Sequence, residues 1–269
     1  MTDVVLSAIQ MNPKLLDVDF NIQATSEFIE KAAEMGSEVI VLPELANTGY
    51  VIPSRKELEM VAEAAPRGKT LTEWEKLAKR YGVFIVGGFA ERDGNKIYNA
   101  SVLLGPNGFI GTYRKIHLFG REKQIFDPGD KDLWVNKTEK NVNIGLLICF
   151  DWIFPEVARV LSLKGATILA HSANLVLPYA QRAMPIRALE NRVFTITANR
   201  IGEENGVKFT GMSIIANPQG EILVKASRDE EEIITAKVNI EEALDKKITP
   251  ENDLFSDRRP EFYKKIVET

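Results

Sequence analysis

"GLLICFDWIFPE", residues 145–156, joins an apolar run to the start of a helix. The apolar run from 142 to 148 predicts a buried strand, and Pro155 followed by Glu156 is typical of a first helical turn. Cys149, the only cysteine of the chain, stands between the two. A strand that leads into a helix is the building unit of α/β folds, which carry their reactive side chains at the carboxyl ends of strands.

Length and charge limit the classes of protein to which this chain can belong. The chain has 269 residues, 45% of them hydrophobic, and a net charge of −4. This charge gives no electrostatic reason to expect nucleic acid or an anionic membrane as a partner. The N-terminal residues lack the basic and apolar regions of a signal peptide, and no apolar run approaches the ~20 residues of a membrane helix.

The single cysteine excludes an internal disulfide and is typical of a reducing compartment, so we expect a cytoplasmic protein. Two glycosylation-type triplets begin at Asn99 and Asn136. Without an export signal, we interpret both as chance.

Segments typical of strands and helices alternate along the chain. The predicted strands are 4–11, 38–44, 83–91, 97–105, 107–117, 142–148, 167–173 and 193–198, followed by a hairpin at 213–227. The predicted helices are 19–35, 70–81, 155–164 and one that ends near 192. The pattern predicts a single α/β domain over residues 1–269, with mixed sheets and helices outside them.

Local signals refine these boundaries. Thr70 and Glu73 offer a capping box at the start of one helix, and Gly82 is a typical stop at its end. The pair 93–94, Asp-Gly, predicts a hairpin turn. We expect Pro185 in the first turn of its helix, where a missing N–H costs little.

Two charged residues stand near the ends of predicted strands. Glu44 closes the apolar run 38–44, although an average glutamate in such a loop is simply solvated. If the strand containing Lys115 continues, Tyr113, Lys115 and His117 share one face. A lysine buried on that face needs a carboxylate partner, and the alternative is a surface lysine.

Cys149 has two interpretations that the sequence leaves open. Free cysteines are among the most buried residues and are often inert. Its position at a strand end, before a helix N-terminus and with an ammonium nearby, instead favours a reactive thiolate. Glu44 is then a candidate base and Lys115 a candidate charge stabiliser, although spacing alone does not bring the three residues together.

Three motifs in this order resemble those of the nitrilase superfamily of carbon–nitrogen hydrolases. They are "VLPELANTGY" around Glu44, "YRKIHLF" around Lys115 and "LLICFDWIFPE" around Cys149. Other matching stretches include "FDPGD", "AHSANLVLP" and "NPQGEIL", and the resemblance extends from about Val5 to Asp257. The chain is most similar to small archaeal nitrilase-like and amidase-like enzymes. The resemblance implies a four-layer α-β-β-α sandwich.

The resemblance also implies a catalytic triad of Glu44, Lys115 and Cys149, with Glu122 as a second carboxylate beside it. Glu44 would accept the thiol proton while Cys149 attacks the carbon of a nitrile or amide. Lys115 and the backbone N–H of Phe150 would hold the oxyanion. Ammonia would leave a thioester that water hydrolyses to the acid, with no metal or cofactor. An exposed loop charge remains the alternative for Glu122.

The implied substrate site is rich in aromatic residues and has no charged ones. Its candidate residues are Tyr50, Phe119, Phe150, Trp152, Asn174 and Tyr179. Such a lining suits a small aliphatic substrate, although core packing is the alternative role for these side chains. The string 149–151, Cys-Phe-Asp, departs from the Cys-Trp-Glu of many nitrilases. This departure favours an amidase acting only on amides or a nitrilase of the small archaeal type, and it does not separate the two. An N-acyltransferase using the same acyl-enzyme is a further alternative.

Subunits of the superfamily usually pair, so we expect a homodimer or a higher homo-oligomer. The charged tail, 250–269, has Phe255, Phe262 and Tyr263 as its only aromatic residues. We expect this tail at the oligomer interface.

Other functions remain to be weighed against hydrolysis through the triad. A cysteine–histidine hydrolase would use His117 or His171, the only two histidines of the chain. A non-catalytic scaffold would leave the thiol without a role. An ammonia-donating glutaminase unit would need a synthetase partner.

Overall fold

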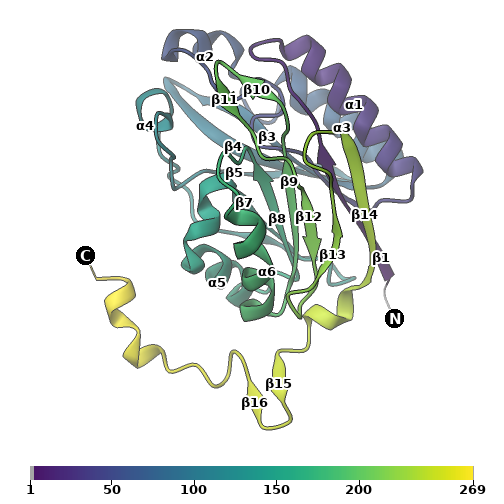
Figure 1. Cartoon of the computed structure of the whole chain (residues 1–269), viewed down its shortest axis with the longest axis vertical. Coiled ribbons are helices and arrows are strands. Elements are labelled where there is room, and N and C mark those ends of the chain that lie inside the picture. Colours follow the sequence, from purple (N-terminus) through teal and green to yellow (C-terminus); the bar gives the residue numbers. More distant parts are fainter. Residues whose placement is uncertain (1–2, 269) are drawn as a thin grey trace.

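The computed structural model describes residues 3–268, in which two six-stranded sheets pack face to face (Figure 1). The strands of the first sheet, in spatial order, are β14 (Glu232–Asn239), β1 (Asp3–Gln10), β2 (Val39–Val41), β3 (Phe84–Asp93), β4 (Lys96–Gly105) and β5 (Gly108–Arg114). Those of the second are β13 (Ile222–Lys225), β12 (Ile214–Ala216), β9 (Phe194–Asn199), β8 (Ile168–Ala173), β7 (Ile144–Ile148) and β6 (Val135–Asn136).

Each sheet combines parallel and antiparallel pairs, as the alternating pattern predicts. Strands β1, β2 and β3 are parallel, and so are β7, β8 and β9. Short antiparallel pairs are formed by β10 (Glu203–Glu204) with β11 (Val207–Lys208) and by β15 (Lys247–Thr249) with β16 (Asn252–Asp253).

Helices form the two outer layers. The α-helices are α1 (Val18–Glu34), α2 (Arg55–Val61), α3 (Lys69–Tyr81), α4 (Glu122–Ile125), α5 (Pro155–Leu163) and α6 (Ala180–Asn191). Short 3-10 helices are η1 (Cys149–Ile153), η2 (Ile240–Ala243), η3 (Pro260–Phe262) and η4 (Lys264–Ile266). Apolar side chains of α1 and α3 pack on the first sheet, and those of α5 pack on the second. The predicted α-β-β-α sandwich is confirmed.

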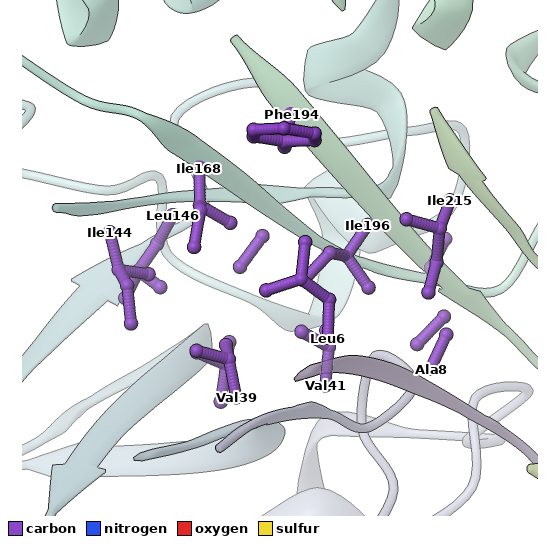
Figure 2. Packing of buried hydrophobic residues seen from close by; sticks show 14 of the residues in the cluster. Leu6, Ala8, Val39, Val41, Ile144, Leu146, Ile168, Phe194, Ile196 and Ile215 are labelled. Carbon is purple, nitrogen blue, oxygen red and sulfur yellow. The ribbon is translucent and has the colours of Figure 1, made fainter. Parts of the chain in front are cut away.

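Burial on both faces explains the continuous apolar runs of the central strands. Val39 and Val41 of β2 point into the space between the sheets, where they meet side chains such as Ile144 and Ile168 (Figure 2). Ile40, between them, packs with the helices on the other side. Alternate residues of such a strand face opposite layers, so a β-branched residue suits every position.

Strand β5 ends at Arg114, three residues before the predicted end at 117. The carbonyl of Lys115 accepts the N–H of Gly129 at 2.9 Å, which takes the chain out of the ladder. A Cβ on Gly129 would lie 2.2 Å from the carbonyl oxygen of Arg114, so the approach requires glycine. The alternation expected for Tyr113, Lys115 and His117 therefore does not extend past β5.

Two other local predictions are wrong. Helix α3 starts after Gly68, and the Thr70 hydroxyl and N–H donate to Glu63, so Thr70 does not cap the helix. Pro185 lies inside α6, since that helix already begins at Ala180, and the proline removes one internal hydrogen bond. The Gly82 stop, in the left-handed conformation, is confirmed.

The final segment leaves the body of the protein, as Figure 1 shows in yellow. The Phe255 ring lies 5.4 Å from the Arg159 guanidinium and 5.3 Å from the Lys246 ammonium. Phe262 and Val267 are 69% and 84% exposed. Thr269 lies outside the described residues. Within residues 3–268, no helix combines the length and apolar character needed to cross a membrane.

The contact between the sheets is expected to supply much of the stability. Leu6 is fully buried there, whereas Leu223 on β13 is 43% exposed. We expect Leu6→Ala to lower the free energy of unfolding by about 2–5 kcal/mol, because it leaves a cavity, and Leu223→Ala to lower it by well under half of that. Urea unfolding of the two variants checks this, and equal losses would contradict the assignment of the core.

Candidate active site

Cys149 occupies a sharp bend between β7 and η1. Its φ of +40° lies in the left-handed region, which is uncommon for a residue with a side chain. Two hydrogen bonds hold the bend: the Ile148 N–H donates to Asp151 Oδ2 at 2.9 Å, and His171 Nε2–H donates to the Cys149 carbonyl at 2.9 Å. The thiol is thereby presented at the carboxyl end of β7.

Asp151 accepts further hydrogen bonds beside this bend. Its Oδ2 also accepts the Tyr113 hydroxyl at 2.8 Å, and its Oδ1 accepts His117 Nδ1–H at 2.8 Å. The His117 ring stacks on Phe154, with 3.6 Å between the ring centroids. Tyr113 and His117 thus hold Asp151, which in turn holds the bend at Cys149. Lys115, between them in the sequence, has other partners.

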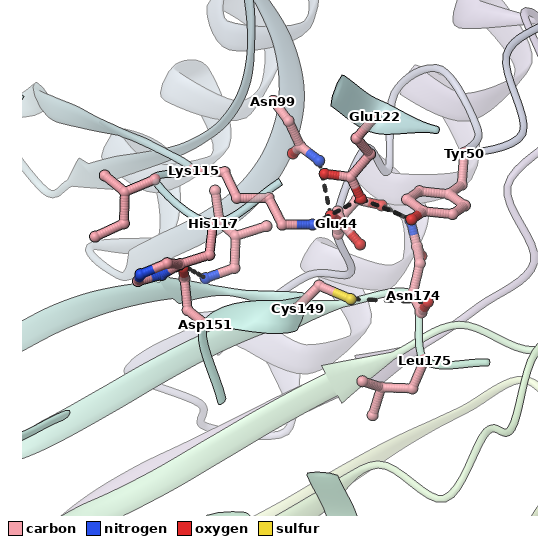
Figure 3. A network of polar contacts seen from close by, with 12 residues as sticks. Glu44, Tyr50, Asn99, Lys115, His117, Glu122, Cys149, Asp151, Asn174 and Leu175 are labelled. Atoms are coloured by element: carbon pink, nitrogen blue, oxygen red, sulfur yellow. Dashed lines mark hydrogen bonds and ion pairs between the residues drawn. The ribbon is translucent and has the colours of Figure 1, made fainter. Parts of the chain in front are cut away.

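The Lys115 ammonium lies between two carboxylates (Figure 3). Its Nζ donates to Glu44 Oε1 at 2.7 Å and to Glu122 Oε1 at 2.8 Å. Tyr50 donates its hydroxyl to the same Glu122 oxygen at 2.6 Å. Lys115 and Glu44 are fully buried, and Glu122 is 4% exposed, so the lysine is not a surface residue and Glu122 is not an exposed loop charge.

Neighbouring strands enclose Glu44. Asn99 on β4 donates its side-chain N–H to Glu44 Oε1 at 2.7 Å, and Asn174 donates to the Glu44 carbonyl at 2.8 Å. A Cβ on Gly88 of β3 would lie 2.5 Å from the Glu44 Cα, so the strand can approach only as glycine. The Cys149 S–H points to the Asn174 carbonyl, with 3.8 Å from sulfur to oxygen.

Burial and charge shift the ionisation of this cluster. Burial alone would lower the pKa of Lys115, but the charges of Glu44 and Glu122 raise it overall, so the ammonium stays protonated. Burial raises the pKa of Glu44, and the nearby Glu122 adds to the rise that Lys115 opposes.

The surroundings of Cys149 do not favour the thiolate form in the resting protein. Burial, followed by the charge of Glu44, raises the pKa of the Cys149 thiol well above its usual range, and the Lys115 charge compensates only partly. Its resting form is a neutral thiol. Its reaction as a nucleophile requires a base that takes the proton.

Two carboxylate oxygens remain available for such a role. Across residues 3–268, neither Glu44 Oε2 nor Glu122 Oε2 has a hydrogen-bond partner, although both are buried. Buried polar atoms without a partner are uncommon and call for an explanation. Over the same residues, no three His, Cys, Asp or Glu side chains gather in a way that could hold a metal ion.

A cavity of about 160 Å³ opens beside the thiol. Its lining consists of Phe119, Cys149, Phe150, Trp152, Ile153, Asn174, Leu175, Val176, Leu177 and Tyr179. Five of the six predicted substrate residues belong to this lining, and it includes no Asp, Glu, Lys or Arg. Tyr50, the sixth, is not part of the lining and instead contacts Glu122.

Neither histidine is placed as a base for the cysteine. His171 uses Nε2–H on the Cys149 carbonyl, and burial lowers its pKa to about 4. Its Nδ1 lies 3.1 Å from the Thr197 hydroxyl. His117 is bound to Asp151. The geometry therefore does not favour a cysteine–histidine hydrolase.

Sequence reasoning missed Asn99 as a site residue. The residue carries one of the glycosylation-type triplets, yet it is fully buried against Glu44. Its only signal in the sequence is a polar side chain within the apolar strand 97–105. A buried amide in such a strand needs a partner, but the sequence does not identify it.

Comparison with known proteins gives consistent matches. The family model described as carbon–nitrogen hydrolase matches residues 5–245. The chain is 50% identical over 260 residues to a protein of Pyrococcus abyssi named nitrilase, covering 97% of this chain and 99% of that protein. It is 30% identical over 275 residues to the N-carbamoylputrescine amidase of Solanum lycopersicum, covering 93% and 91%.

Solved structures agree with these matches in fold. An amidase from Nesterenkonia sp. superposes with a TM-score of 0.81 at 22% identity, covering 98% of this chain and 96% of that chain. Saccharomyces cerevisiae Nit3, a member of the nitrilase superfamily, superposes with a TM-score of 0.81 at 27% identity, covering 90% and 92%.

The lowered pKa of His171 gives a prediction about acid stability. Between pH 6.5 and about 4, the unfolded chain binds a proton at this residue and the folded protein does not, so stability falls as the pH drops through this window. Protonation of His171 in the unfolded chain lowers the free energy of unfolding by up to about 3 kcal/mol over this window. In His171→Gln this part of the pH dependence should disappear.

Urea unfolding of wild type and His171→Gln at several pH values measures it. The two proteins share their other titrating groups, so the difference between their curves isolates the histidine. A difference that stays constant between pH 6.5 and 4 would contradict the prediction.

Proposed function

This chain belongs to the carbon–nitrogen hydrolase family, and on that premise we propose that it hydrolyses a small nitrile or amide through Cys149. The observation that carries the proposal is the fully buried Lys115 ammonium, bonded to Glu44 and Glu122 beside a neutral thiol. Burial of a charge network of this kind costs folding free energy. Side chains with strongly shifted pKa values are frequently catalytic.

The first half of the reaction transfers the acyl group to sulfur. Glu44 removes the thiol proton, and the sulfur electron pair forms a bond to the carbon of the substrate. For an amide, the carbonyl electrons move to oxygen, and Lys115 with the Phe150 N–H stabilises the oxyanion. The carbon–nitrogen bond then breaks, nitrogen takes the proton from Glu44, and ammonia leaves a thioester.

The second half releases the acid. Glu44, ionised again and beside Glu122, takes a proton from water, whose oxygen attacks the thioester carbon. The proton then returns to the departing sulfur. A nitrile passes through a thioimidate, to which water adds before ammonia leaves. In both cases Glu122 holds Lys115 in place through the 2.8 Å contact.

The cavity supports a small, uncharged aliphatic substrate. Its volume is about 160 Å³, and its lining is aromatic and aliphatic apart from Cys149, Asn174 and the Tyr179 hydroxyl. A charged substrate would lose its hydration there without gaining an opposite charge. Relatives carry both the name nitrilase and the name amidase, so the proposal covers both classes.

Ammonia release from a panel of small aliphatic nitriles, dinitriles and matching amides tests the proposal. We expect turnover by wild type, none detectable for Cys149→Ala, and at least about 10²-fold less for Glu44→Gln, which removes the base while keeping its shape. Glu59→Gln, an exposed carboxylate on α2, is the matched control and should be unchanged.

Three results would count against the proposal: equal turnover by Cys149→Ala, full activity of Glu44→Gln, and no reaction with either substrate class. Reaction with amides alone would define an amidase. Transfer of the acyl group to an added amine, in place of free acid, would define an acyltransferase using the same acyl-enzyme.

We also propose that the tail, described over 250–268, packs against a second copy of the chain. A cavity of about 1070 Å³ lies between α5 and this tail, and it is lined by Val160, Leu163, Ile266 and Val267 among others. These four side chains are 37% to 84% exposed in one chain. Exposed apolar groups gathered in one groove are typical of a protein–protein contact.

Light scattering over a concentration series tests this pairing. We expect a dimer or larger species for wild type, and a dissociation constant at least about tenfold higher for Leu163→Asp, because removing a carboxylate from water at an apolar contact is costly. Leu223→Asp is the matched control, since Leu163 and Leu223 are both 43% exposed. A monomer at every concentration, or equal effects of both variants, would contradict the pairing.

A further inference from the structure

Asn99 joins the two charged residues of the candidate site from a neighbouring strand. Its side-chain N–H donates to Glu44 Oε1 at 2.7 Å, and its backbone carbonyl accepts the Lys115 N–H at 2.8 Å (Figure 3). The residue is fully buried on β4. One residue therefore contacts Glu44 through its side chain and Lys115 through its main chain.

These contacts make the two oxygens of Glu44 unequal. Oε1 accepts both the Asn99 amide and the Lys115 ammonium, each at 2.7 Å. A carboxylate oxygen has two lone pairs, so these donors occupy Oε1 fully. Oε2 is buried and, over residues 3–268, has no hydrogen-bond partner.

We infer that Asn99 is a positioning residue that occupies Glu44 Oε1 and so makes Oε2 the oxygen that takes the thiol proton. The inference depends on the proposed function, in which Glu44 is the base. In this step the S–H bond of Cys149 breaks, an O–H bond forms at Oε2, and the sulfur keeps the electron pair that bonds to the substrate carbon. Asn99 is not part of the lining of the cavity beside the thiol.

The amide of Asn99 also favours the ionised form of Glu44. Burial raises the pKa of Glu44, and the hydrogen bonds from Lys115 and Asn99 oppose the rise. Removal of the Asn99 donor should raise this pKa further, and a base with a higher pKa becomes active only at higher pH. Besides the neutral Asn99 amide, Glu44 has electrostatic interactions with titratable or charged groups. These groups are Lys115, Glu122, Cys149, Tyr50 and Arg200.

The test uses two variants and a matched control on the same strand. Asn99→Ala removes the donor, and Asn99→Leu removes it while keeping the branched shape of the side chain. Ser101→Ala lies two residues along β4, fully buried, and over residues 3–268 its hydroxyl has no partner. The comparison uses those Asn99 variants whose thermal unfolding shows a folded protein.

The first readout is the rate at which iodoacetamide alkylates Cys149 as a function of pH. This rate falls at low pH when Glu44 is protonated and cannot take the thiol proton. We expect the acid limb to move up by about one to two pH units in the Asn99 variants, because hydrogen bonds to charged groups are strong. Below the limb, the alkylation rate should then be lower than that of wild type by about tenfold to a hundredfold. Ser101→Ala should follow wild type.

The second readout is the pH dependence of kcat/KM for a substrate found in the panel, which should move in the same direction. An acid limb that stays at the wild-type position in the folded Asn99 variants, or moves equally in Ser101→Ala, overturns the inference. Alkylation needs no substrate. If no nitrile or amide in the panel reacts, the alkylation readout still tests the role of Asn99. Failure of the proposed function and failure of this inference therefore give different results.

Discussion

The ion pairing of Lys115 with Glu44 and Glu122 is the constraint on which the site depends. An ammonium that is fully removed from water is strongly destabilising unless opposite charges surround it at hydrogen-bond distance. Here the partners lie at 2.7 and 2.8 Å and come from the loop after β2 and from α4. Burial, followed by the charge of Glu44, raises the pKa of the nearby Cys149 thiol, and Lys115 opposes this rise only in part.

The residues around Cys149 position a thiol that is protonated at rest. The turn at Cys149 is held in an unfavourable left-handed conformation by Asp151 and by His171. Both act on the backbone rather than on sulfur, so they position the nucleophile without changing its charge. Proton transfer is then left to a carboxylate, and Asn99 distinguishes one oxygen of Glu44 from the other.

The packing of the two sheets brings these groups together. Glu44 follows β2 of the first sheet, whereas Cys149 follows β7 of the second. Asn174, which follows β8, connects them: its amide donates to the Glu44 carbonyl, and its own carbonyl accepts the Cys149 S–H. The apolar layer between the sheets, seen in Figure 2, therefore fixes the geometry of the site as well as the fold.

The sequence by itself determined the alternation of strands and helices, because β-branched runs and helical periodicity depend on neighbouring residues. It also singled out Glu44, Lys115 and Cys149 by their positions at strand ends and by their motifs. Only the tertiary structure decided that Asn99 contacts Glu44, that β5 ends before His117, and that Cys149 rests as a neutral thiol. Contacts between strands far apart in the chain, and the burial that shifts a pKa, exist only after the sheets have packed.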